Sequence, residues 1–577
     1  MFIIPVPQKM AEKSDRIQLR ALYAQADCTE ILRFASEFQQ GGDFCVSFTQ
    51  CASTVKEFYT LRTAADGIFI TYADLEGAFR ACATLHQLLA QSENGTIPAV
   101  EIEDFPQIAH RGYMLDVSRG KIPTLAYLKR LVDILAALKY NELQLYMESF
   151  VFEHKNFPEY TQDTEPLTRA EIRELAQYCR ERFITLVPNQ NSFGHMGAWT
   201  RKSALSHLAI TGKNGQPSGT LNPLLDGSIA LMDQIYDGFF DAFDSERVHI
   251  GMDEPFDLGL NETQAACAQR GIGAVYTDYL NRVCRLVTEK YRKIPMFWDD
   301  IVFKHPEQLA NIPKNAIVMQ WGYETEQHFD RNCRRLQEHG LKFYVCPGTS
   351  MWGSFTGRTN NALVNITSAA ECGVYYGADG FLLTEWGDGG HPQFPATTYF
   401  PLVLGGSVSW NCMSHNHEVA YDQRRALVDA CKRYMDRYLY GCNSGPSLAD
   451  IVYRAGNYYL CEDALNFNGT ELIHCIYRYG DRTDAQKAGF RRVRAYIDGI
   501  LRELDTVKAD AIAVREIRCN CEMVRFAAQI LVNGSCCHAD RDRLFAEFES
   551  LWRLKNHTAG IHDFETFLVE RLGKAMA

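Results

Sequence analysis

The sequence lacks the features of membrane, nucleic-acid-binding and repeat proteins. No run of apolar residues is long enough to span a bilayer. Basic residues are in the minority, with 59 Lys and Arg against 71 Asp and Glu, so the formal net charge of -12 argues against binding held by phosphate contacts. Neither a short-period repeat nor a low-complexity tract is present. Neutral or weakly charged substrates fit this balance better.

Residues 1–16 also lack the basic leader and long apolar run of a secretory signal. We therefore expect a cytoplasmic protein whose 19 scattered cysteines are reduced thiols. Cys519 and Cys521 lie near Cys536 and Cys537 and suggest zinc ligands. Zinc knuckles usually place cysteines around turn-forming glycines, whereas these lie in helix-like sequence, so buried thiols explain them better.

The 577 residues are enough for two or three domains, and their patterning changes twice. Residues 1–107 mix short apolar runs such as Gly67–Tyr72 with the helix-like Leu75–Leu89, which predicts a small α+β domain. Residues 108–415 alternate apolar runs with amphipathic stretches, as parallel strands joined by helices do. Residues 416–577 predict a helical C-terminal region, which could be a cap or the surface of a homodimer.

Eight apolar runs in residues 108–415 predict an α/β fold, a (β/α)8 TIM barrel. Leucines spaced three and four apart from Leu125 to Leu138 predict a helix after the first strand. Thr168 and Glu171 have the spacing of a capping box at the start of the next helix. The expected strands are Tyr113–Asp116, Glu142–Tyr146, Ile184–Pro188, Val248–Gly251, Pro295–Trp298, Ala316–Gln320, Lys342–Cys346 and Gly380–Leu383.

In such a barrel the active site lies at the carboxyl ends of the strands. Four of the chain's seven tryptophans fall there, together with several carboxylates. A sugar ring has an apolar face that stacks on indole and hydroxyls that carboxylates and arginine bind, so this set predicts a sugar pocket. The alternative is that the tryptophans only pack loops against the barrel. Arg111 precedes the first strand, and the residues at the strand ends are Asp116, Arg119, Glu148, Asn189, Asn191, His195, Asp253, Glu254, Trp298, Asp299, Asp300, Trp321, Tyr323, Trp352, Glu385, Trp386, Asp388 and His391.

Asp253 and Glu254 are the sharpest feature, because two adjacent acids directly follow the run Val248–Gly251. Neighbouring strand residues point to opposite sides, so the two carboxylates are expected to differ in task. The usual retaining mechanism needs an acid and a nucleophile on opposite sides of the scissile bond, which adjacent acids fit poorly. They suit the substrate-assisted variant, in which the sugar's 2-acetamido oxygen attacks the anomeric carbon.

The segment HIGMDEPFDLG, His249–Gly259, resembles the HIGGDE signature of glycoside hydrolase family 20, with Met252 in place of the second glycine. RGYMLDVSRG, Arg111–Gly120, resembles the family's first barrel strand, and DGIFITYADLEGAFRACATLHQLL resembles the small α+β domain before its barrel. The similarity covers about residues 60–415. It implies an exo-acting, retaining β-N-acetylhexosaminidase that removes terminal β-linked GlcNAc or GalNAc through an oxazolinium intermediate.

The resemblance also implies catalytic roles. Glu254 would be the general acid and then the general base, and Asp253 would orient the 2-acetamido group and steady the oxazolinium charge. His195, in NSFGHMGAW, resembles the family's histidine after strand three. Glu148 stands where the usual partner of that histidine is an aspartate, and together they would tune Glu254. Arg111 would bind ring hydroxyls of the terminal sugar.

Trp386, in EWGDGGH, resembles the tryptophan at the base of the family's sugar pocket, and Asp388 falls where a glutamate usually binds outer hydroxyls. One departure is visible. Many members carry a tyrosine after strand seven that binds the acetamido oxygen, whereas CPGTSMWGS offers Trp352, and Tyr323 after strand six could substitute. The expected substrate-binding set is Arg111, Trp298, Trp321, Tyr323, Trp352, Trp386 and Asp388.

Two readings from other classes stay open. One is a catalytically silent barrel that binds glycans, although a pure binding site has no need of a proton donor beside a carboxylate. The other is a metal-dependent hydrolase that uses His195, Asp253, Glu254 and Asp299. The main expectation needs neither a metal nor a cofactor, because the carboxylates and His195 already have other roles.

Overall fold

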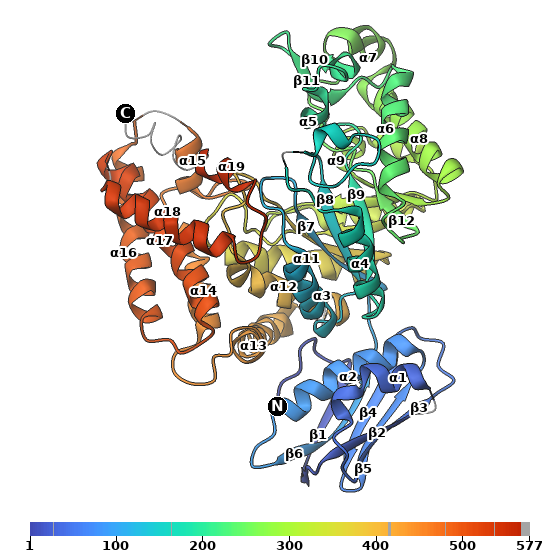
Figure 1. Cartoon of the computed structure of the whole chain (residues 1–577), viewed down its shortest axis with the longest axis vertical. Helices are drawn as coiled ribbons and strands as arrows, with labels where there is room; N and C mark the ends of the chain where they lie inside the picture. Colours follow the sequence, from blue (N-terminus) through green and yellow to red (C-terminus); the bar gives the residue numbers. More distant parts are fainter. Residues whose placement is uncertain (27, 163, 413–416, 479–480, 536, 567–577) are drawn as a thin grey trace.

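The protein has three parts: an N-terminal sheet with helices, a central barrel and a C-terminal group of helices (Figure 1). In the part of the chain that the structure describes, no helix is long and apolar enough to cross a membrane. The expected boundary between residues 415 and 416 lies outside the described residues. The computed structural model describes residues 1–26, 28–162, 164–412, 417–478, 481–535 and 537–566.

The N-terminal domain is a six-stranded sheet in the order β1-β6-β4-β5-β3-β2, which confirms the predicted α+β domain. Alternate residues of β3 and β4 are buried, as expected for strands that cover a core with one face. Two helices lie between this sheet and the barrel (Figure 1). The elements are β1 (Lys9–Gln18), β2 (Leu22–Ala26), α1 (Thr29–Phe34), β3 (Phe44–Gln50), β4 (Tyr59–Ala64), β5 (Gly67–Tyr72), α2 (Leu75–Ala90) and β6 (Thr96–Asp104).

The barrel is closed by eight parallel strands, and each of the eight apolar runs forms one of them. A small hairpin, β10 (Ala209–Thr211) and β11 (Pro217–Leu221), lies in the long connection after β9. The barrel strands are β7 (His110–Asp116), β8 (Glu142–Met147), β9 (Thr185–Gln190), β12 (Arg247–His249), β13 (Ile294–Trp298), β14 (Ile317–Trp321), β15 (Lys342–Cys346) and β16 (Gly380–Glu385).

Helices connect the barrel strands, and the predicted capping box of Thr168 and Glu171 begins α4. The leucine stripe after β7 forms α3, which Thr124 caps. The helices are α3 (Leu125–Ala137), α4 (Arg169–Arg180), α5 (Gly197–Thr200), α6 (Asp226–Phe239), α7 (Gln264–Arg270), α8 (Ile272–Arg285), α9 (Asp300–Lys304), α10 (Phe329–Glu338), α11 (Thr359–Tyr376) and α12 (Pro395–Trp410).

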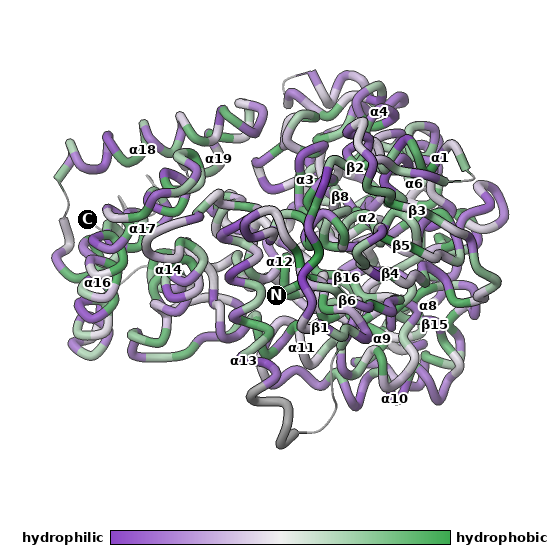
Figure 2. Tube along the Cα trace, turned by 90° about the horizontal axis from the view of Figure 1, so that it is seen from below, coloured by the Kyte–Doolittle hydropathy of each residue, from purple (hydrophilic) through white to green (hydrophobic). Residues whose placement is uncertain are grey.

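The C-terminal region is helical, as predicted, and hydrophilic and hydrophobic residues alternate along α16, α17 and α18 (Figure 2). Cys519 and Cys521 are buried in α17, whereas Cys536 lies outside the described residues. The helices are α13 (His417–Tyr434), α14 (Leu448–Ala455), α15 (Glu471–Tyr477), α16 (Asp484–Leu504), α17 (Ala511–Asn533), α18 (His538–Trp552) and α19 (Ile561–Glu565).

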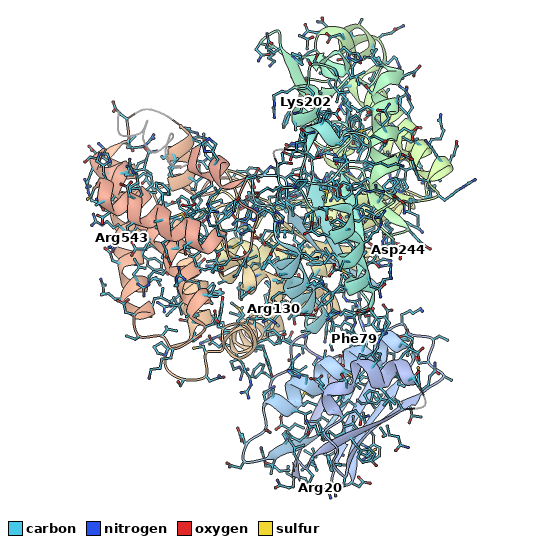
Figure 3. All side chains as sticks on the ribbon, in the orientation of Figure 1. Arg20, Phe79, Arg130, Lys202, Asp244 and Arg543 are labelled. Carbon is cyan, nitrogen blue, oxygen red and sulfur yellow. The ribbon has the colours of Figure 1, made fainter. Side chains whose placement is uncertain are left out.

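A buried network of charges fixes the N-terminal domain to the amino-terminal end of the barrel. Glu57 Oε2 accepts hydrogen bonds from Arg111 at 2.6 Å and from Arg80 at 2.8 Å. Beside it, Lys139 Nζ lies 2.7 Å from Asp104 Oδ2. Figure 3 shows Phe79 on α2, facing the barrel at this junction. The paired charges make the interface specific, because each would be costly to bury alone.

The expected role of Arg111 in binding sugar hydroxyls is wrong. Arg111 is the second residue of β7, so it lies at the amino-terminal end of the barrel, opposite the active-site end. Its side chain is fully buried and donates to Glu57 and to three backbone carbonyls. The motif RGYMLDVSRG holds two arginines, and the seven-residue strand separates them across the barrel.

Arg111→Met should therefore destabilise the protein. It leaves Glu57 paired with Arg80 alone, and breaking such a buried pair costs about 3–5 kcal/mol. Burial raises the pKa of Glu57, but Arg111 and Arg80 outweigh burial and lower the pKa from 4.5 to about 2. Ionised Glu57 therefore stabilises the fold above pH 4.5, and this contribution is lost as the pH falls towards 2.

Chemical unfolding at pH 7 and pH 4 measures both effects. The loss in Arg111→Met should be larger at pH 7 than at pH 4. Arg20→Met, which removes an exposed arginine paired with exposed Asp43 in the same N-terminal domain, is the control and should change stability little. Unchanged stability in Arg111→Met would contradict the structural role.

Candidate active site

A pocket opens at the carboxyl ends of the barrel strands and gathers most of the expected site residues. Glu148 lies beside it, against His195 and Arg119. A larger cavity of about 670 Å³ between α1, α2 and α3 is lined by Phe34, Phe79 and Arg130 but holds no adjacent acid pair, so the strand-end pocket is the candidate site. The pocket is lined by Arg119, His195, Asp253, Glu254, Trp298, Trp321, Tyr323, Trp352, Trp386, Asp388 and Asn468.

Asp253 and Glu254 lie beyond the end of β12, on backbone that is not a strand. Gly251, Met252 and Glu254 have left-handed conformations, with φ of 70°, 79° and 47°. These turns bring both carboxylates to His195 Nε2, Asp253 Oδ2 at 3.4 Å and Glu254 Oε2 at 3.2 Å. The expectation that strand alternation sends the two acids to opposite sides is therefore wrong, because the strand ends before it reaches them.

Asn191, after β9, holds this turn in place. Its Nδ2 donates to Asp253 Oδ1 at 3.0 Å, and its Oδ1 accepts from the backbone N–H of Met252 at 3.2 Å. A Cβ on Gly251 would lie only 2.0 Å from Asn191 Oδ1, so this position requires glycine for its close approach as well as its φ. Asn191 is one of the expected strand-end residues, but it does not belong to the expected catalytic set.

His195 lies among three carboxylates. Besides the contacts with Asp253 and Glu254, its Nδ1 is 3.5 Å from Glu148 Oε2. Burial lowers the pKa of His195, but the carboxylates, Asp253 foremost, outweigh burial and raise the pKa to about 11. Burial raises the pKa of Asp253, yet His195 and Asn191 bring it below its ordinary value. The site therefore holds an imidazolium beside an ionised Asp253.

The two acids differ in exposure. The side chain of Asp253 is 9% exposed, and that of Glu254 is 36% exposed. The backbone N–H of Glu254 donates to Asp300 Oδ2 at 3.3 Å, and burial together with the charge of Asp253 raises the pKa of Asp300 to about 7. Asp253 is thus a deep, fixed anion, whereas Glu254 can reach a group in the pocket.

Tyr323 lies at the centre of an aromatic wall. Its ring stacks on Trp321 with centroids 5.0 Å apart and meets the ring of Trp352 edge-on at 4.9 Å. Its hydroxyl accepts from Trp386 Nε1 at 2.8 Å, and Trp386 lies 5.9 Å from Trp298. The four expected tryptophans therefore form one continuous wall with Tyr323, which suits the apolar face of a sugar and a methyl group.

Arg119 occupies the pocket in place of Arg111. Its guanidinium lies over the ring of Trp386 at 5.1 Å. It contacts three carboxylates: Asp116 at 2.6 Å, Glu148 at 3.4 Å and Asp388 at 3.7 Å. Arg119 follows the expected strand Tyr113–Asp116, whereas Arg111 precedes it. This order in the sequence could have identified Arg119 as the arginine at the carboxyl end.

Asn468 is a pocket residue that the sequence did not predict. It comes from the C-terminal helical region, between α14 and α15, and its Oδ1 accepts from Trp352 Nε1 at 2.7 Å. It lies 116 residues beyond Trp352 in the chain, and no motif connects the two. Only the docking of the helical region on the barrel brings Asn468 to the site.

Comparison with known proteins agrees with this fold and site. The family description "Glycosyl hydrolase family 20, catalytic domain" matches residues 108–370, and "Glycosyl hydrolase family 20, domain 2" matches residues 2–105. The chain belongs to glycoside hydrolase family 20. The family-20 catalytic match spans seven barrel strands, β7 to β15, and so includes the acid pair and His195.

Family-20 relatives cover only part of the chain. The β-hexosaminidase subunit alpha of Bos taurus is 30% identical over 319 residues, which is 52% of this chain and 59% of that protein. The β-hexosaminidase subunit beta of Felis catus is 26% identical over 290 residues, 46% of this chain and 54% of that protein. The chain thus spans about half the length of the curated relatives that it matches.

Two solved structures share the family-20 fold. A β-N-acetylhexosaminidase from Bacteroides fragilis aligns with a TM-score of 0.62 and 18% identity, covering 78% of this chain and 98% of that one. A chitobiase from Flavobacterium johnsoniae aligns with a TM-score of 0.61 and 19% identity, covering 96% of this chain and 98% of that one. At these identities the likeness establishes the fold.

The contacts of His195 predict that it stays protonated at neutral pH. In Asp253→Asn its pKa should fall by more than one unit, because the largest attraction on the imidazolium is removed. Carbon NMR of the protein labelled at histidine Cε1 measures this, and His195→Gln identifies the signal. Asp257→Asn, an acid on the same loop that bonds to Thr220, is the control. A wild-type His195 that titrates near pH 6.5 would contradict the ion cluster.

Proposed function

We propose that the chain is an exo-acting, retaining β-N-acetylhexosaminidase that removes terminal β-linked GlcNAc or GalNAc by substrate-assisted catalysis. The observation that carries this proposal is the contact of Asp253 and Glu254 with one nitrogen of His195. An acid and an enzymic nucleophile must have the anomeric carbon between them. Here an imidazole nitrogen occupies that position, so the arrangement favours a nucleophile that the substrate itself supplies.

Family membership and the names of the matched relatives, which are β-hexosaminidase subunits, support the same activity. A silent binding barrel fits less well, because a binding site has no need to hold a reachable acid beside a buried anion. A metal centre on His195, Asp253, Glu254 and Asp299 also fits less well. His195 is held as a cation, and a protonated imidazole has no lone pair for a metal.

In the first step, the carbonyl oxygen of the 2-acetamido group attacks the anomeric carbon and the bond to the leaving oxygen breaks. Glu254 gives its proton to that oxygen. Asp253 accepts the acetamido N–H and balances the positive charge of the oxazolinium ring. In the second step, the Glu254 carboxylate takes a proton from water, whose oxygen attacks the anomeric carbon and reopens the ring. Two inversions at one carbon give net retention.

The remaining pocket residues bind the sugar. Trp298, Trp321, Trp352 and Trp386 enclose the apolar ring face and the acetamido methyl group. Arg119 and Asp388 lie together on the opposite side of the pocket from β12, where a donor and an acceptor can bind outer hydroxyls. Because the charges of Arg119 and Asp388 cancel, the pair suits a neutral sugar.

Glu254→Gln should lower turnover about 10²–10⁴-fold, because Gln keeps the size of Glu but carries no transferable proton. The loss should be larger for N,N′-diacetylchitobiose than for 4-nitrophenyl β-GlcNAc, since nitrophenolate departs without protonation. Asp253→Asn should lower both rates by similar factors, because the oxazolinium forms with either leaving group. Release of GlcNAc and of nitrophenolate measures these rates.

Specificity for the acetamido group is the control for this mechanism. Wild-type enzyme should cleave 4-nitrophenyl β-GlcNAc and β-GalNAc, with or without chelator, and leave the β-glucoside and β-galactoside intact. Comparable cleavage of the plain sugars would show that the acetamido group is not the nucleophile. Loss of activity with chelator would favour the metal-dependent reading.

Arg119→Met should raise KM for 4-nitrophenyl β-GlcNAc about tenfold or more, because it removes donors that face the outer hydroxyls. Arg111→Met should leave KM within about twofold at temperatures where the variant is folded. Initial-rate kinetics of both variants measure this difference. Equal effects on KM would contradict the assignment of Arg119 to the pocket.

A further inference from the structure

A short loop of the helical region, residues 462–470, reaches the candidate pocket, and hydrogen bonds hold its conformation at both the base and the tip. Its base is closed by Glu462, whose carboxylate accepts the backbone N–H groups of Glu471 at 2.7 Å and Leu472 at 3.0 Å. At its tip Asn466 and Gly469 pair across a turn, and Asn468 between them has a φ of 57°. The backbone that carries Asn468 is therefore held from both ends of the loop.

The barrel fixes the tip of this loop through a charged anchor. Glu324, after β14, accepts the backbone N–H of Asn468 at 2.8 Å. Arg358 holds Glu324 with two hydrogen bonds of 2.9 Å, and its own side chain is 2% exposed. Thr470 N–H donates to the carbonyl of Gly353 at 2.9 Å. The loop therefore sits on the barrel in one register beside the pocket.

The side-chain amide of Asn468 has a defined orientation. The indole N–H of Trp352 can only donate, so the atom that it meets at 2.7 Å is the oxygen of Asn468. The Nδ2 hydrogens consequently face away from Trp352. None of the hydrogen bonds among the described residues uses Nδ2, and Asn468 is an exposed residue that lines the same pocket as Asp253 and Glu254.

A donor in this place meets a need of the proposed reaction. The acetamido carbonyl oxygen must be held for attack, and ionised Asp253 cannot donate to it. Arg119 lies with Asp388 on the side of the pocket proposed for the outer hydroxyls, His195 is engaged by carboxylates, and the N–H of Trp386 is donated to the hydroxyl of Tyr323. Among the described residues that line the pocket, the indole N–H groups of Trp298 and Trp321 and the hydroxyl of Tyr323, which is 7% exposed, belong to the aromatic wall, whereas the open amide of Asn468 is on an exposed residue.

We propose that Asn468 determines specificity for the acetamido group, with its Nδ2 donating a hydrogen bond to the acetamido carbonyl oxygen. This rests on the hexosaminidase function proposed above. The indole of Trp352 sets the direction of the amide, and the Glu324–Arg358 pair sets the position of its backbone. The helical region is thus part of the sugar site.

Asn468→Asp tests this role, because a carboxylate keeps the acceptor for Trp352 but carries no hydrogen to donate. We expect kcat/KM to fall about 10–100-fold, by the same factor for 4-nitrophenyl β-GlcNAc and N,N′-diacetylchitobiose. The thermal midpoint should change little, since the side chain is exposed. Leu465→Ala, which alters a 73% exposed side chain of the same loop, is the control and should stay within twofold.

A binding measurement separates recognition from catalysis. In the Glu254→Gln background, calorimetric titration should show that Asn468→Asp weakens GlcNAc at least fivefold and leaves binding of glucose unchanged. A loss confined to chitobiose would place Asn468 against the leaving group and overturn the proposal. A loss in Tyr323→Phe with none in Asn468→Asp would assign the donor to Tyr323 instead. An inactive wild-type enzyme that still binds GlcNAc would instead count against the proposed function.

Discussion

The active site depends on one interaction, the attraction between the His195 imidazolium and three carboxylates. Without that cation, Asp253 and Glu254 would repel each other in a half-buried site, and Asp253 would take up a proton. With it, Asp253 stays an anion at low exposure, and the more exposed carboxylate of Glu254 lies against the same imidazole nitrogen. One positive charge therefore holds two neighbouring acids together at one point of the site.

The backbone that brings the acids to His195 is conformationally strained. Residues with φ near +50° to +80° are unfavourable when they have a side chain, yet Met252, Glu254 and His195 all adopt such values. Asn191 offsets part of this cost by bonding both to Asp253 and to the backbone of Met252. The strain lies where a straight strand would have separated the two carboxylates.

Much of the fold could be predicted because it depends on local patterns. The eight apolar runs all became barrel strands, and the capping box at Thr168 begins its helix. Site residues at strand ends followed from the same pattern. The errors arose where position along a strand decides the outcome: Arg111 and Arg119 share one motif, but β7 carries them to opposite ends of the barrel. Periodicity marks a strand, but only the direction of the chain along it tells that Arg119, which follows β7, lies at the pocket end.

Asn468 shows why the rest could not be predicted. Its place depends on Glu324 and Arg358, which bind the loop from another part of the chain, and none of the three carries a motif. Trp352 stands where many family members have a tyrosine, and its indole N–H orients the amide of Asn468. A loop distant in the sequence can therefore supply a donor that the stretch around Trp352 lacks. With Asn468 in the proposed role, sugar recognition is coupled to domain docking, because any shift of the helical region moves Asn468.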